Sequence, residues 1–142
     1  MFRQISQRVW ASPQISLADV DAAAAQGITL IINNRPEGES DDQTPGDAIA
    51  QAAAAAGMGY VAIPVTHAGF SQAQVSAMAE ALKGDGKILA YCRSGTRSTL
   101  LWSLAQASLG ADLDEVTAQA ASAGYDVSPV RPLMDMLAAQ AG

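Results

Sequence analysis

A cysteine followed closely by two arginines is the feature of this sequence most typical of chemistry. The segment CRSGTRS, residues 92–98, holds Cys92, the only cysteine of the chain, with Arg93 and Arg97 after it. A thiolate is a strong nucleophile, and nearby guanidinium groups both stabilise it and bind anionic substrates. A lone cysteine after an apolar strand could instead be an ordinary core residue. The two arginines and Gly95 favour the catalytic interpretation, because a packed cysteine gains nothing from charged neighbours.

The same segment has the composition of an anion-binding loop at the start of a helix. The apolar run KILAYC predicts a buried strand that leads into it, and GTRSTLLWSLAQASLG, beginning at Gly95, shows helical spacing. Gly95 lets the backbone curl, and N–H groups that precede a helix have no helical acceptor. We therefore predict that the backbone of Ser94, Gly95, Thr96, Arg97 and Ser98 cradles an anion. The Ser98 hydroxyl can also donate to the sulfur or to a leaving sulfur.

Composition excludes several other functions. The net charge of −6, without a basic cluster, argues against a nucleic-acid partner. Apolar runs such as ITLII are far too short to span a membrane, and the N-terminus lacks a signal-peptide core, so we expect a soluble, cytoplasmic protein. One cysteine and one histidine, His67, leave no disulfide and no cysteine-rich metal site. We expect neither a metal nor a cofactor.

The elements that must position CRSGTRS alternate between strands and helices. FRQISQRVWAS predicts one or two short strands, and ITLII, YVAIPV and KILAYC predict buried ones. Helices are predicted in LADVDAAAAQG after Ser16, from about Asp47 to Ala56, in QAQVSAMAEALKG after Ser71, and in three segments from Gly95 to the end. This order predicts a single α/β domain, residues 1–142, with a central, mainly parallel sheet flanked by helices.

Three loops follow the buried strands, and the carboxyl ends of parallel strands are where sites form. They read NNRPEG, THAGFS and CRSGTRS. Arg35 in the first could hold an anionic substrate or simply pair with Glu37 and Glu39. The acids of residues 37–42 have no metal-ligand spacing and are interpreted as a solvated loop. His67 in the second could protonate a leaving oxygen or be a surface residue.

CRSGTRS resembles the active-site loop of rhodaneses and, more loosely, the cysteine-to-arginine loop of protein tyrosine and dual-specificity phosphatases. Those phosphatases place five residues between cysteine and arginine, whereas Cys92 and Arg97 are separated by four, the rhodanese count. From about Phe2 to Ala107, the N-terminal strands, INNRPEGES, YVAIPV and CRSGTRSTLLW are similar to the phosphatase-like domain family of beta-lactamase hydrolase-like fusion proteins. The resemblance implies a dual-specificity-phosphatase-like fold with a sulfurtransferase-type loop.

The phosphatase fold also expects an aspartate acid in the loop that here reads THAGFS, which has no carboxylate. Because sulfur transfer needs no such acid, the leading hypothesis is a sulfurtransferase. Cys92 would form a persulfide, taking sulfur from a small anionic donor, thiosulfate or a low-molecular-weight persulfide, and passing it to a thiol or cyanide. The resemblance implies a functional link to a persulfide dioxygenase. The alternatives are a cysteine-dependent phosphatase with a phosphocysteine intermediate and a non-enzymatic anion-binding or redox-sensing module.

Overall fold

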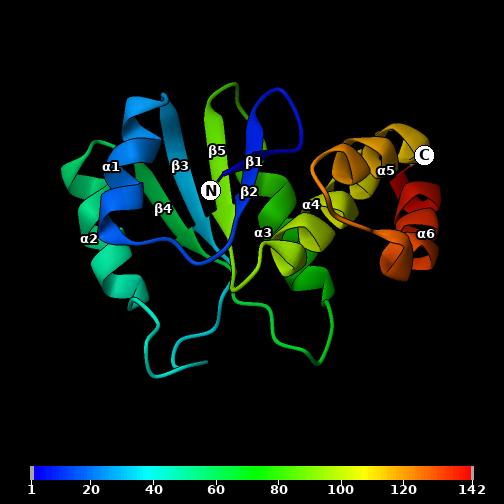
Figure 1. Ribbon diagram of the computed structural model, residues 1–142. Helices are drawn as coiled ribbons and strands as arrows, with labels where there is room; N and C mark the ends of the chain where they lie inside the picture. The colour runs from blue at the N-terminus through cyan, green and yellow to red at the C-terminus, as the bar shows by residue number, and fades with distance from the viewer. Residues whose placement is uncertain (1, 142) are drawn as a thin grey trace.

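The computed structural model describes residues 2–141 and contains a five-stranded sheet with helices on both faces (Figure 1). The strands are β1 (Arg3–Gln4), β2 (Val9–Ser12), β3 (Ile28–Asn33), β4 (Gly59–Ala62) and β5 (Lys87–Tyr91). The helices are α1 (Leu17–Ala25), α2 (Gly46–Ala55), α3 (Gln72–Ala81), α4 (Thr96–Ser108), α5 (Leu113–Ser122), the 3₁₀ turn η1 (Ser128–Val130) and α6 (Arg131–Ala141). Met1 and Gly142, at the predicted ends of the domain, lie outside the described residues.

The sheet has the strand order β1-β2-β5-β3-β4. β5 pairs in parallel with β2 and β3, and β3 pairs in parallel with β4, while the short β1 adds an antiparallel edge. The mainly parallel sheet predicted from the alternating elements is confirmed. Because β5 occupies the centre, the residues that follow it emerge between the ends of β2 and β3.

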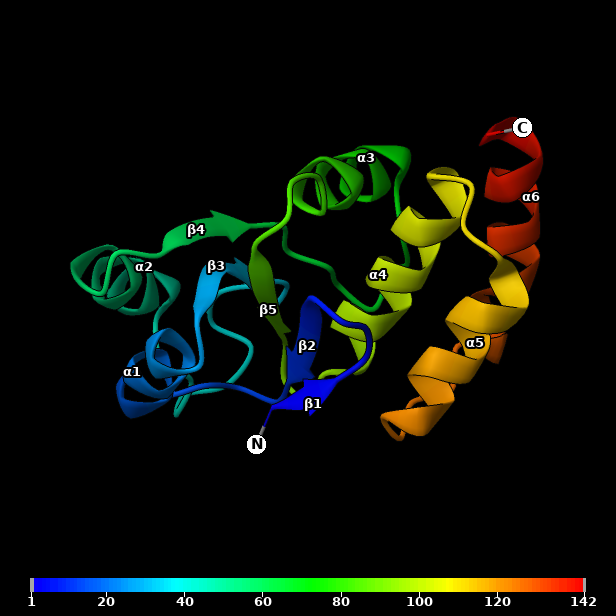
Figure 2. The same cartoon turned by 90° about the horizontal axis from the view of Figure 1, so that it is seen from above.

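Two hydrophobic cores lie on opposite faces of the sheet. Ile31 and Leu89 face α1 and α2 and pack with residues such as Val20 and Ile49. The other face is covered by α3 and α4, with α5 and α6 packed outside α4, as the view from above shows (Figure 2). Trp102, expected to be a core residue, belongs to this second core and is 1% exposed.

Local signals in the sequence set the helix starts. Ser16 and Ser71 each accept a hydrogen bond from the third helical residue in a capping box, as their predicted N-cap roles require. The alanine helix begins at Gly46, one residue earlier than predicted, and a Cβ there would overlap the Glu37 carboxylate and crowd the Tyr60 hydroxyl. None of the helices in residues 2–141 is long and apolar enough to cross a membrane.

Candidate active site

Cys92 lies at the carboxyl end of β5, directly after the last strand residue. It is fully buried, and its backbone N–H donates to Ser12 O of β2 at 3.3 Å. The N–H of Gly95 donates to Cys92 Sγ at 3.2 Å, so the chain after Cys92 curls back over the sulfur. A backbone N–H aimed at sulfur stabilises the anionic thiolate over the neutral thiol.

The carbonyl groups of this loop are tied away from the sulfur. Arg93 O accepts from the N–H of Gln14 at 3.2 Å, and Ser94 O accepts from the hydroxyl of Tyr125 at 3.3 Å. Gly95 O accepts from both the N–H and the hydroxyl of Thr99, at 3.0 and 2.9 Å. With its carbonyls held outward, the loop can turn its N–H groups toward an anion, and the first turn of α4 adds N–H groups without helical acceptors.

Gly95 is required at the turn of the loop by both its backbone and its surroundings. Its φ of +91° is a left-handed conformation that residues with a Cβ rarely adopt. A Cβ on Gly95 would overlap the Tyr125 hydroxyl and approach the backbone of Ser12. The predicted role of Gly95 in shaping the loop therefore has a direct structural cause.

A Gly95→Ala variant is expected to lose about 2 kcal/mol or more of its free energy of unfolding, because the clash with Tyr125 adds to the left-handed backbone cost. Gly57→Ala is the matched control, since Gly57 has φ +80° with nothing within 4 Å of its added Cβ. The control should lose about 1 kcal/mol. Chemical denaturation measures both, and equal losses would mean that Tyr125 does not crowd this position.

Arg97 is held in a fixed orientation by the segments that follow β3 and β4. Its Nη1 and Nη2 donate to Glu39 Oε2 and Oε1 at 2.6 and 2.8 Å, a two-pronged ion pair. Nη1 also donates to Val65 O at 2.6 Å. The hydrogen bonds to Glu39 raise the pKa of Arg97, and its interaction with the Cys92 sulfur acts in the same direction. Arg97 is thus a permanent cation beside Cys92.

Glu39 joins Arg97 to Arg35. Arg35 Nε donates to Glu39 Oε1 at 2.9 Å, while its Nη1 and Nη2 donate to Gln14 and Ser40. Hydrogen bonds from Arg97, then from Arg35, hold the pKa of Glu39 at about 2 against the opposing effect of burial. Arg35 is only 4% exposed and pairs with Glu39, one of the two partners considered from sequence. Its binding of a substrate anion stays a prediction.

A Glu39→Gln variant is expected to lose about 3 kcal/mol of stability, because it leaves two nearly buried guanidinium groups without a counter-charge. The folded-state pKa lies below the ordinary value of 4.5, so this stabilisation is complete above that pH and disappears as pH falls toward 2. The gap between variant and wild type should therefore close in acid. Denaturation at several pH values checks this.

Glu80→Gln is the matched control, since Glu80 pairs with Lys83 where both side chains are mostly exposed. It should change stability by less than about 0.5 kcal/mol at any pH. A Glu39→Gln loss equally small would show that the Arg35–Glu39–Arg97 cluster does not contribute to stability.

The remaining predicted site residues differ in position. Arg93, Ser94 and Thr96 are exposed on the rim of the loop. Ser98 is fully buried, and its Oγ has no hydrogen-bond partner among the described residues, which leaves it free for the predicted bond to sulfur. His67 is exposed and makes no hydrogen bond or ion pair within residues 2–141, so a role in proton transfer stays a prediction.

Sequence reasoning did not identify how three residues, Glu39, Gln14 and Tyr125, hold the site. Glu39 was assigned to a solvated acidic loop, and this is wrong for Glu39, because both arginines draw it inward. Gln14 donates its backbone N–H to Arg93 O and accepts a hydrogen bond from the Arg35 side chain. Tyr125 reaches Ser94 from beyond α5. Only Glu39 had a signal in the sequence, as the acid four residues after Arg35.

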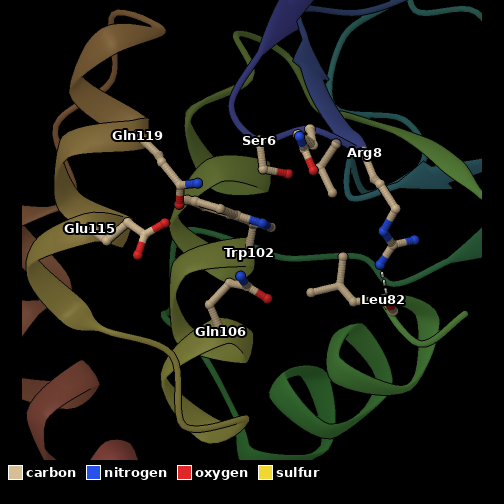
Figure 3. Close-up of a pocket in the computed structure, with 9 residues that line it drawn as sticks. Ser6, Arg8, Leu82, Trp102, Gln106, Glu115 and Gln119 are labelled. Atoms are coloured by element: carbon tan, nitrogen blue, oxygen red, sulfur yellow. Dashed lines mark hydrogen bonds between the residues drawn. The ribbon is translucent and has the colours of Figure 1, made fainter. Parts of the chain in front are cut away.

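A cavity of about 510 Å³ lies away from the Cys92 loop, between the β1–β2 turn, α4 and α5. Figure 3 shows Gln106, Glu115 and Gln119 around Trp102, with Arg8 on the opposite wall. Arg8 uses its guanidinium to bind the carbonyls of Leu82 and Gly86. None of the residues lining the cavity belongs to the loop. Within residues 2–141, no three side chains of metal-ligating type are grouped to hold an ion.

Comparison with known proteins shows which family this chain resembles. Residues 1–109 match the family model described as beta-lactamase hydrolase-like protein, phosphatase-like domain. A beta-lactamase hydrolase-like protein from Agrobacterium fabrum is 35% identical over 105 residues, and one from Xylella fastidiosa is 34% identical over 125. These matches cover 73% and 87% of this chain but only 24% and 29% of the relatives. The chain thus corresponds to one part of much longer proteins.

Solved structures support the same fold. A candidate phosphatase from Neisseria meningitidis superposes with a TM-score of 0.81 at 32% identity, covering 95% of this chain and 96% of that one. Tk-PTP in its active form (TM-score 0.74, 16% identity, 98% and 97% covered) and human DUSP28 (0.68, 15%, 99% and 96%) share the fold. The predicted phosphatase-like fold is confirmed. The comparisons support a phosphatase-like domain, and this fits the phosphatase alternative weighed from sequence better than the leading sulfurtransferase hypothesis.

Proposed function

Because the chain belongs to the family of phosphatase-like domains of beta-lactamase hydrolase-like proteins, we propose that it is a cysteine-dependent phosphatase. The observation that carries the proposal is the placement of Arg97, held by Glu39 and Val65, beside a buried Cys92 whose sulfur already accepts a backbone N–H. This arrangement supplies a nucleophile and a fixed cation for the same anionic group.

In the proposed reaction, the Cys92 thiolate attacks the phosphorus of a phosphate monoester. The sulfur–phosphorus bond forms as the bond from phosphorus to the ester oxygen breaks, and the leaving oxygen takes a proton from water or from His67. Water then attacks the phosphocysteine, releasing inorganic phosphate and restoring the thiolate. Arg97 and the loop N–H groups neutralise the charge on the phosphoryl oxygens in both steps.

Sulfur transfer is the second candidate, and two observations favour it. Cys92 and Arg97 enclose four residues rather than the five of protein tyrosine phosphatases, and the loop of Thr66 to Phe70 has no carboxylate to act as an acid. Here Cys92 would take sulfur from an anionic donor and pass it to a thiol, and a persulfide dioxygenase would be the matching partner enzyme. Either chemistry needs a reduced thiol, which suits the cytoplasm.

One pair of assays separates the candidates: hydrolysis of p-nitrophenyl phosphate beside sulfur transfer from thiosulfate to cyanide. We expect hydrolysis, with a phosphorylated Cys92 trapped by rapid acid quench and seen by mass spectrometry. Sulfur transfer with a single added sulfur on Cys92, and no hydrolysis, would replace the phosphatase proposal. If the protein shows neither activity, the remaining interpretation is a non-enzymatic module that binds an anion or senses redox state.

A further inference from the structure

Tyr125 reaches the Cys92 loop from the segment between α5 and η1. Its side chain is 8% exposed, and its hydroxyl donates to Ser94 O at 3.3 Å. The fit is close, since a Cβ on Gly95 would overlap that hydroxyl. The family model ends at residue 109, so Tyr125 lies outside the part of the chain that the family defines.

One peptide unit contacts both Tyr125 and Cys92. The carbonyl of Ser94 accepts the Tyr125 hydrogen bond, and the N–H of Gly95, in the same planar unit, donates to Cys92 Sγ at 3.2 Å. In a trans peptide the C=O and N–H point in opposite directions. A single orientation of this unit therefore satisfies the tyrosine on one side and the sulfur on the other.

We propose that Tyr125 is a positioning residue that holds the Ser94–Gly95 peptide with its N–H toward the Cys92 sulfur. This proposal rests on the proposed function, in which Cys92 is the nucleophile. The hydrogen bond to the carbonyl also polarises the peptide, so its N–H becomes a better donor to a thiolate. If the tyrosine hydroxyl is removed, this peptide can rotate more freely, because Gly95 has no Cβ to restrict its backbone. A rotated peptide would turn the carbonyl oxygen toward the sulfur and repel the thiolate.

Tyr125 is itself fixed before it meets the loop. Its N–H donates to Ala120 O at 2.9 Å, which ties it to the end of α5. The Arg3 guanidinium lies 5.3 Å from the centre of its ring, and Arg3 Nη1 donates to Ala123 O at 3.3 Å. Contacts from β1 and from the end of α5 thus fix the position of the Tyr125 side chain, with its hydroxyl already placed to donate to Ser94 O.

The other charged and titratable groups around the sulfur stay in place when only the hydroxyl is removed. They are Arg97 of α4 and Glu39, which pairs with it. Arg93 and His67, on the loops after β5 and β4, are exposed and also keep their places. Arg3 lies over the Tyr125 ring, which a phenylalanine retains. A Tyr125→Phe variant therefore isolates the hydrogen bond to Ser94.

The test measures alkylation of Cys92 by iodoacetamide in the full chain, from about pH 4 to about pH 10. Tyr125→Phe should move the midpoint of the rate-against-pH curve upward by about half a pH unit, which is about a threefold slower reaction below the midpoint. The acid limb of kcat/KM for p-nitrophenyl phosphate should shift equally. Tyr60→Phe is the matched control, because Tyr60 loses a hydroxyl bonded to Asn33. Its midpoint should match wild type.

Coincident midpoints for Tyr125→Phe and wild type would overturn the proposal and leave Tyr125 a packing residue. Should the variant fail to fold, the wild type supplies a second measurement. The amide proton of Gly95 should shift in NMR spectra with the same pH midpoint as alkylation, and an unresponsive amide would equally overturn the proposal. Alkylation needs no phosphoryl transfer, so an inactive wild type would refute the phosphatase while leaving this comparison valid.

Discussion

A Cys92→Ser variant is expected to lose hydrolysis of an aryl phosphate by on the order of 10⁴-fold while it keeps its fold. The serine hydroxyl stays protonated near neutral pH, and Arg97 with the loop N–H groups cannot make it a comparable nucleophile. His67, the one histidine of the chain, is exposed and makes no hydrogen bond or ion pair within residues 2–141, so nothing positions it as a base for the serine. Rates with p-nitrophenyl phosphate, measured beside circular dichroism and thermal melting, check this.

Phosphate binding provides the control for this variant. The serine leaves the loop N–H groups and Arg97 intact, so inhibition or binding by inorganic phosphate should change by less than about threefold. The same variant should lose sulfur transfer if the native chain has that activity. A folded Cys92→Ser variant that keeps a tenth of its rate would remove Cys92 from the chemistry under either candidate function.

An Arg97→Lys variant is expected to lose about 10²- to 10³-fold in kcat, although the charge is retained. The guanidinium bonds Glu39 through two nitrogens and Val65 O as well, and only a planar fork does this while still facing the sulfur. A lysine ammonium that pairs with Glu39 could not also bind the phosphoryl group of the substrate, which would then lose this positive charge. Steady-state kinetics with an aryl phosphate measure the loss, which should fall mainly on kcat.

Arg131→Lys is the matched control for replacing a planar guanidinium with an ammonium group. Arg131 also pairs with two carboxylates, Asp114 and Asp135, but it is about one third exposed and lies on α6. Its substitution should leave kcat within about twofold of wild type and stability within about 0.5 kcal/mol. An Arg97→Lys variant as active as this control would make Arg97 a structural ion pair only.

Much of the fold follows from local patterns along the chain. Alternating apolar runs and capped helices are short-range signals, so Ser16, Ser71 and the strand before Cys92 could be interpreted correctly without any tertiary information. The carboxyl ends of parallel strands share one edge of a sheet, which predicts that the loops after β3, β4 and β5 converge. The bond of Arg97 to Val65 and its ion pair with Glu39 confirm this convergence.

The sequence by itself determined the proposed nucleophile and its immediate surroundings, because Cys92, Gly95 and Arg97 lie within one short loop whose chemistry depends on near neighbours. Only the tertiary structure decided what holds that loop. The partners of Glu39 are set by how far two arginines reach across strand ends, and Tyr125 meets Ser94 because α5 packs outside α4. Such contacts between distant segments depend on packing geometry, which leaves no periodic signal in the residues themselves.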